Sequence, residues 1–151
     1  MSAGTWKIHD SYLKYLGSTA DQGSATFKIR LFTSASNVHT ASVNGIASAT
    51  NEISGGGYAE KTLSGVEWTL TSTTSGATAL WKATDVEWTA SGSTIAARFA
   101  AIYNDSIASP VADPIVASVL LDSTPADVSA TSGQVLTIVL SSGIFRGTHG
   151  Y

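Results

Sequence analysis

The sequence predicts an all-β fold, an antiparallel β-sandwich of the jelly-roll kind with one short N-terminal helix. Three observations lead to this prediction. Short segments in which apolar and polar residues alternate recur along the chain, as in Phe27-Lys-Ile29-Arg-Leu31, and a period of two is typical of strands. The connections between these segments are rich in Gly, Ser, Thr, Asn and Asp, which favour turns. Only one segment repeats its apolar residues at helical spacing.

That segment predicts a helix over residues 8–17, near the start of the chain. Its apolar residues recur every three or four positions, and Gly17 can serve as the C-terminal cap. The apolar residues are Ile8, Tyr12, Leu13, Tyr15 and Leu16. The helix could plug one end of the sandwich, or residues 1–17 could form an arm that docks on a neighbouring subunit.

About seven or eight strands are expected after the helix. The first spans residues 25–33, with Phe27, Ile29 and Leu31 on one face and a wetter face opposite that carries Lys28, Arg30 and Phe32. The other segments with a strand pattern are 58–63 and 66–72, which we interpret as a strand pair, then 77–84, 95–103, 115–121 and 135–141.

The apolar residues of these strands define the expected core. Its predicted members are Phe27, Ile29, Leu31, Val66, Trp68, Leu70, Phe99, Ile102, Val119, Leu121 and Val139. Residues 1–151 are expected to form one domain, since a chain of this length is long enough to bury a two-layer core.

Two segments are expected to be flexible and to contact partners. Residues 34–57 form a long stretch of small polar residues that ends in three glycines, and loops of this length are usually functional or ordered by a partner. Residues 146–151 form a glycine-containing tail. Neither segment contributes a predicted core residue, so we expect both to reach across an interface.

The composition excludes several function classes. Only 13% of residues are charged and the net charge is -3, which makes nucleic-acid binding improbable because phosphate contacts need clustered Lys and Arg. Roughly a quarter of the residues are Ser or Thr, well suited to a neutral surface. There is no cysteine, hence no disulfide or thiolate metal site. No apolar run reaches the ~20 residues of a membrane helix or forms a signal peptide, so we expect a soluble protein made in a cytoplasm.

The residues that carry catalysis are sparse. His9, His39 and His149 lie far apart in sequence and show none of the spacings typical of metal sites or acid–base catalysis. Gly55-Gly56-Gly57 has no strand-to-helix context, so phosphate binding there is improbable. We therefore expect no enzyme, no catalytic or metal-binding residues and no cofactor.

Two weaker hypotheses involve acidic residues. Glu67 and Glu87 occupy matching positions in a repeated Val-Glu-Trp-Thr segment, a pair that could serve a sugar hydrolase or could simply sit on the wet faces of two strands while the tryptophans point inward. Asp122, Asp127 and residues 105–113 could supply calcium ligands, but without a dense acidic pattern their Asp residues are more simply explained as turn formers.

Several motifs resemble a family of small structural proteins of tailed-bacteriophage virions, described as head-decoration or tail-fibre-like proteins. The most specific are Glu52-Ile-Ser-Gly-Gly-Gly-Tyr58 and the block from Val86-Glu-Trp88 to Ala101-Ile-Tyr103, and the likeness covers roughly residues 8–145. The resemblance implies a non-enzymatic role and transfers no active-site residue to this chain.

Two functions follow as expectations from this resemblance. The first is a capsid decoration (cement) protein on the virion, which binds the outer surface of the major capsid protein lattice, stabilises the head and forms a homotrimer. The second is a tail-fibre or receptor-binding module in which exposed Trp81, Trp88 or Tyr103 contacts host-surface glycans. Neither involves nucleic acid or a membrane.

Overall fold

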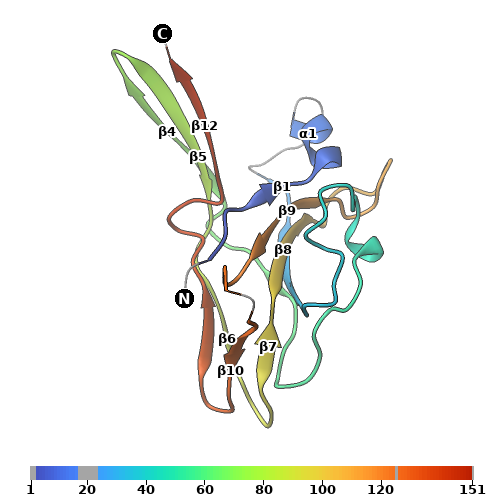
Figure 1. Ribbon diagram of the computed structural model, residues 1–151. Coiled ribbons are helices and arrows are strands. Elements are labelled where there is room, and N and C mark those ends of the chain that lie inside the picture. The colour runs from blue at the N-terminus through green and yellow to red at the C-terminus, as the bar shows by residue number, and fades with distance from the viewer. Residues whose placement is uncertain (1–2, 17–23, 125, 151) are drawn as a thin grey trace.

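A computed structural model describes residues 3–16, 24–124 and 126–150. The described chain consists mainly of antiparallel strands, which confirms the all-β prediction (Figure 1). The strands are β1 (Lys7–Ile8), β2 (Phe27–Phe32), β3 (Lys61–Thr62), β4 (Glu67–Thr73), β5 (Gly76–Lys82), β6 (Val86–Thr89), β7 (Ile95–Ala97), β8 (Phe99–Asn104), β9 (Ile115–Leu120), β10 (Val128–Ala130), β11 (Val135–Ile138) and β12 (Phe145–Gly150).

The helical elements are short. Helix α1 (Asp10–Leu16) lies within the predicted range 8–17, whose last residue, Gly17, is outside the described residues. A 3-10 helix, η1 (Ile46–Ser48), forms within residues 34–57. No helix in the described ranges is long and apolar enough to cross a membrane.

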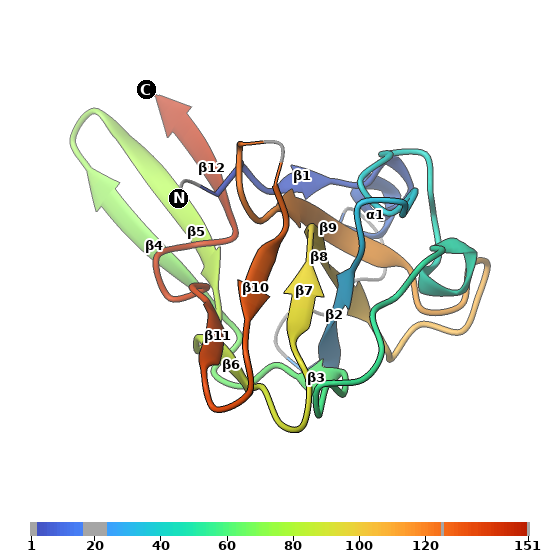
Figure 2. The same cartoon turned by 60° about the horizontal axis from the view of Figure 1, so that its bottom comes forward.

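The largest sheet has five strands in the order β1-β9-β8-β2-β3, and every neighbouring pair is antiparallel. Strand β2 lies inside the predicted strand 25–33 and buries Phe27, Ile29 and Leu31 on one face, as its alternation predicted. Two small sheets, β10-β7 and β11-β6, and a three-stranded sheet, β12-β5-β4, complete the structure (Figure 2).

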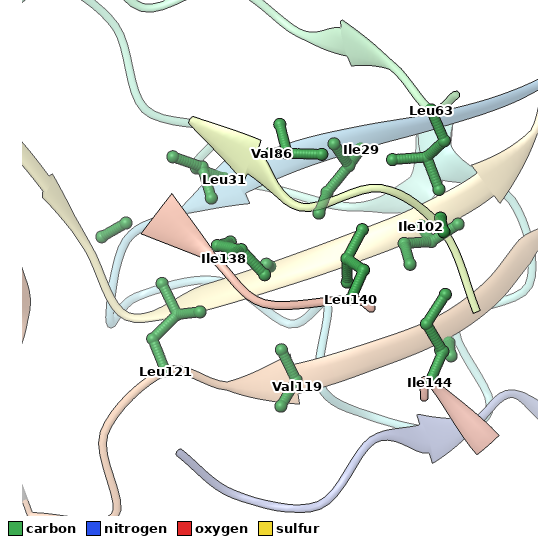
Figure 3. Close-up of a cluster of buried hydrophobic side chains, with 14 of the residues drawn as sticks. Ile29, Leu31, Leu63, Val86, Ile102, Val119, Leu121, Ile138, Leu140 and Ile144 are labelled. Atoms are coloured by element: carbon green, nitrogen blue, oxygen red, sulfur yellow. The ribbon is translucent and has the colours of Figure 1, made fainter. Parts of the chain in front are cut away.

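The main core lies between the five-stranded sheet and the small sheets. In Figure 3, Val86 of β6 lies beside Ile29 of β2 and Leu140 lies beside Ile102 of β8, and all four belong to one buried cluster. The cluster draws residues from Tyr12 to Ile144, so segments from nearly the whole described chain meet in it. Burial of this apolar area is the main force that stabilises the fold.

The opposite face of the five-stranded sheet is also covered, which the sequence analysis did not predict. A second buried cluster joins Phe32, Tyr103 and Ile115 of the sheet to Val38 and Ile46 of the segment 34–57. The expectation that this segment contributes nothing to the core was therefore wrong. Its neutral composition hid isolated apolar residues, of which Val38, Ile46 and Ile53 are buried within the protein's own fold.

Two strand assignments were wrong. Segments 58–63 and 66–72 do not pair with each other, because β3 pairs with β2 and β4 pairs with β5. The predicted strand 95–103 divides at Arg98, so that β7 pairs with β10 while β8 pairs with β2 and β9. The Arg98 side chain donates a hydrogen bond to the carbonyl of Thr124 at 2.6 Å. This bond holds the loop between β9 and β10 beside the break.

Three predicted core residues are exposed instead. Strand β11 buries Leu136 and Ile138, and the buried Leu140 continues this alternation, so Val139 on the other face is 54% exposed. Trp68 and Leu70 are 41% and 69% exposed because β4 extends away from the core. Two further residues of the predicted core are only half-buried: Val66 packs against the main cluster and Phe99 packs against the second cluster.

The C-terminal segment is a strand rather than a flexible tail. β12 pairs with β5 from Phe145↔Trp81 to Gly150↔Gly76, and only Tyr151 of the predicted tail lies outside the described residues. The two glycines that suggested flexibility are extended residues of an ordered ladder.

Candidate interaction surface

A β-arm projects from the body of the molecule. The arm is the three-stranded sheet β12-β5-β4, and Figures 1 and 2 both show it extending beyond the other strands, with the C-terminal strand along one side. Its hairpin turns at residues 73–76. Both β4 and β12 are edge strands, and unpaired edges can pair with or pack on another chain.

Aromatic residues fasten the base of the arm to the core. Trp81 of β5 is fully buried and meets Phe27 edge-to-face with ring centroids 5.1 Å apart. Phe145 of β12 stacks on Trp81 at 4.8 Å, and Trp68 of β4 meets Phe145 edge-to-face at 5.4 Å. These contacts use the ring geometries that aromatic pairs prefer, and they hold all three arm strands at their base.

The two faces of the arm differ in chemistry. The register places Trp68, Trp81 and Phe145 in one row across the three strands and Leu70, Ala79 and Gly147 in the next row on the same face. Ser72, Ala77 and His149 form the row nearest the hairpin turn. The opposite face carries the charged and hydroxyl residues, Glu67, Lys82, Thr69, Arg146, Thr71, Thr78 and Thr148, together with Leu80. The arm therefore presents one apolar face outside the core.

The expected glycan-contacting aromatics are not available for binding. Trp81, Trp88 and Tyr103 are at most 2% exposed, so the prediction that they are surface aromatics was wrong. The indole of Trp88 donates a hydrogen bond to the carbonyl of Ala59 at 2.8 Å, and Trp81 packs in the core. These three rings are buried because each strand directs its ring toward one of the two apolar clusters.

Glu67 and Glu87 occupy separate sheets. Glu67 of β4 forms an ion pair with Lys82 at 3.0 Å, and Glu87 of β6 accepts a hydrogen bond from Thr137 at 3.3 Å. Both glutamates are exposed, as the simpler interpretation predicted, but the accompanying tryptophans differ: Trp88 is buried, and Trp68 is half-exposed on the arm.

Two histidines that are far apart in sequence converge on one serine. His9 Nε2 lies 2.9 Å from Ser118 Oγ, and His39 Nδ1 lies 3.2 Å from the same atom. His9 Nδ1 lies 2.7 Å from the carbonyl oxygen of Val43. A carbonyl only accepts, so Nδ1 of His9 carries the proton, the Ser118 hydroxyl donates to His9 Nε2, and His39 donates to Ser118. The spacing of the histidines in the sequence could not reveal this chain of hydrogen bonds, because only folding brings His9, His39 and Ser118 together.

The histidine chain is buried rather than placed in a cleft. His9 and Ser118 are fully buried, and the His39 ring stacks on Phe99 at 5.4 Å. Burial lowers the pKa of both His9 and His39, with the nearby Lys7 acting in the same direction and Asp10 opposing it at His9. The arrangement therefore joins β1, β9 and the segment 34–57 through neutral imidazoles. For His149 the structure shows a backbone position opposite Ala77 in β12.

We expect the free energy of unfolding to fall as the pH drops from 7.5 to 5. The unfolded histidines titrate near pH 6.5, whereas the folded ones resist protonation, so the unfolded chain binds more protons below pH 6.5. Their stabilising contribution is complete above pH 6.5 and is lost as the pH falls through the lower folded values. Urea unfolding at several pH values measures this loss. The double variant His9→Gln/His39→Gln should show a flatter profile, and an equally steep one would contradict the assignment.

A charged cluster occupies the outer face of β2. Arg30 donates to Glu60 at 2.7 Å and to Glu52 at 3.1 Å, and Tyr103 donates to Glu60 at 2.8 Å. Lys28 pairs with Asp105 at 3.0 Å. The alternation of Lys28 and Arg30 on one strand was the sequence signal for this cluster.

The pKa values in the cluster fit a structural role. Burial and the hydrogen bond to Glu60 raise the pKa of Tyr103 to about 12. Burial opposes ionisation of Glu60, but the hydrogen bonds from Tyr103 and Arg30 keep its pKa below the usual value. The Tyr103 phenol therefore stays protonated and the Glu60 carboxylate stays ionised. The hydrogen bonds from Tyr103 and Arg30 hold Glu60 on the sheet.

The aspartates suggested as calcium ligands have other partners. Asp105 pairs with Lys28, and Asp122 accepts a hydrogen bond from the backbone of Thr124 at 3.0 Å. Asp113 adopts a turn conformation with φ 48°, and Asp127 is exposed. Within the described ranges, no three His, Cys, Asp or Glu side chains come together in a way that could hold a metal ion.

These observations describe an all-β protein in which the buried polar residues His9, Ser118, Asn104 and Asp122 are hydrogen-bonded within the chain and the β-arm presents an apolar face. Comparisons with protein-family models, with curated proteins and with solved structures found no match.

Proposed function

We propose that the protein is a capsid decoration protein of a tailed bacteriophage, which binds the outer surface of the major capsid protein lattice and stabilises the head without catalysing a reaction. Its place is then the virion surface, and its partners are the major capsid protein and further copies of itself in a homotrimer. The facing β layers are proposed to form a jelly-roll-like sandwich. The resemblance of residues 8–145 to phage virion proteins supports this assignment.

The observation that carries the proposal is the arm. A narrow, three-stranded projection with an apolar face suits contact with a neighbouring subunit. Leu70 is exposed and Trp68 half-exposed on one face of the arm, and apolar side chains gathered on an exposed surface are typical of sites that contact another protein. The cationic Lys28 and Arg30 are paired within the body, which favours neutral contacts over electrostatic capture.

The mechanism is preferential binding to one state of the shell. A protein that binds only the expanded lattice stabilises that state by mass action, and each added copy increases the effect. The alternative, a tail-fibre or receptor-binding module that grips glycans, loses its three proposed contact aromatics because they are buried.

Particles that lack this protein are expected to keep their shape and to release DNA at a lower temperature than complete particles. Re-adding the purified protein should restore heat resistance, since the bound copies bridge capsid subunits. Thermal release of DNA, followed with a dye, measures the effect. If depleted particles are equally heat-resistant but no longer adsorb to cells, the decoration proposal fails and the receptor-binding alternative replaces it.

A further inference from the structure

The apolar face of the arm places a protruding side chain beside a hollow. Leu70, Ala79 and Gly147 lie directly opposite one another on β4, β5 and β12. Leu70 is 69% exposed, whereas a Cβ atom placed on Gly147 would meet no atom within 4 Å. The row therefore consists of a large apolar residue at one edge and a shallow trough of two small residues beside it.

This face carries no Asp, Glu, Lys or Arg in the rows that the register gives. The adjacent row toward the body is aromatic, the adjacent row toward the hairpin turn consists of Ser72, Ala77 and His149, and the charged Glu67, Lys82 and Arg146 belong to the opposite face. Two copies of the face can approach without repulsion between like charges. Contact between two identical faces is therefore electrostatically possible here. On a face rich in one sign of charge, such contact would be unfavourable.

We propose that this face docks on the same face of a second copy of the chain. In a two-fold contact, a residue i of the first copy meets residue j of the second copy, and residue j of the first copy meets residue i of the second. Leu70 of each copy would enter the trough over Ala79 and Gly147 of the other. Packed sheets lie about 10 Å apart, a gap that a leucine facing alanine and glycine can fill.

The size of the face sets the expected strength of the contact. Stable interfaces bury roughly 1,200–2,000 Å², and a single three-stranded arm offers less. We therefore expect pairing that depends on protein concentration in solution and that is strengthened where many copies are held close together. The two-fold contact joins two copies whichever way their bodies assemble, so it adds to the decoration proposal and does not depend on it.

Filling the trough tests the contact. Gly147→Leu places its side chain in open space and at a backbone position outside the left-handed region, so the chain should fold as before. Arm pairing, measured as the concentration dependence of mass by sedimentation, should be lost. Leu70→Ala should have the same effect, because it removes the protruding side chain.

Thr148→Leu is the matched control, since the exposed Thr148 lies next to Gly147 on the opposite face. It should leave the concentration dependence unchanged, and far-UV circular dichroism checks that each variant is folded. If Gly147→Leu associates like the unaltered protein, the proposed contact is wrong. The same holds if the unaltered protein shows no concentration dependence.

The absence of cysteine from the chain allows a direct test of geometry. Chains carrying Leu70→Cys, mixed with chains carrying Gly147→Cys, should be joined by a short bis-maleimide reagent, because Cα atoms on sheets about 10 Å apart are too distant for a direct disulfide. The control replaces Leu70→Cys by Val135→Cys, at a residue 50% exposed on β11. Cross-linking no faster than this control overturns the proposal, and so does a faster Leu70→Cys self-cross-link, which would indicate edge-to-edge pairing of β4.

These experiments use the isolated protein, so their failure is distinct from failure of the decoration proposal. A third outcome also separates the two. If Gly147→Leu keeps normal self-association but no longer restores heat resistance to depleted particles, the arm face contacts the capsid, and the two-fold proposal is wrong.

Discussion

Replacing Trp81 with alanine is expected to lower the free energy of unfolding by about 3–5 kcal/mol, the usual cost of truncating a buried tryptophan. Trp81 is fully buried and contacts both Phe27 of the main sheet and Phe145 of β12. Its loss leaves a cavity at the point where the arm joins the body. The indole N–H has no hydrogen-bond partner among the described residues, so the expected cost comes from lost packing.

Urea unfolding followed by far-UV circular dichroism measures this change without relying on tryptophan fluorescence. Trp68→Ala is the matched control, because Trp68 lies opposite Trp81 in the same row but is 41% exposed. We expect its effect to be clearly smaller. A cost below about 1 kcal/mol for Trp81→Ala would contradict the packing described for the base of the arm.

Replacing Phe32 with alanine is expected to have a cost of similar size, about 3–5 kcal/mol, and a local consequence. Phe32 is 1% exposed and belongs to the second cluster, in which Val38 and Ile46 hold the segment 34–57 on the sheet. Without this ring, backbone amides of the segment should exchange with solvent faster than those of β8 and β9.

Hydrogen exchange read by mass spectrometry tests this prediction, with Val139→Ala as the control at an exposed residue just after β11. If the segment 34–57 exchanges as fast in the unaltered protein as in Phe32→Ala, it is not held by the second cluster. Deleting the segment should unfold the protein for the same reason, because its buried Val38 and Ile46 are part of the core.

The polar groups of the body act in folding, whereas the arm offers the contact surface. His9, Ser118 and His39 connect three segments in a buried chain, and Arg30 and Glu60 tie a loop to the sheet. The donors and acceptors of these side chains are bonded within the protein, whereas in a binding cleft they would face a ligand. The apolar face beside Leu70 is left available, which is why both proposals concern association between proteins.

Local alternation in the sequence by itself determined that the protein is built from strands and which residues of β2 face the core. Such patterns report the period of the backbone and the existence of a buried face. They predicted Phe27, Ile29 and Leu31 correctly because this face of β2 belongs to the main core, together with Ala100 and Ile102 of the neighbouring β8.

Only the tertiary structure decided which strands stay within the body and which leave it. Trp68 and Leu70 alternate as well as the residues of β2, yet β4 pairs only with β5 and projects beyond the core. The convergence of His9 and His39 on Ser118 likewise depends on contacts between segments distant in sequence. Periodicity identifies a face of a strand, but burial of that face depends on what the rest of the chain places against it.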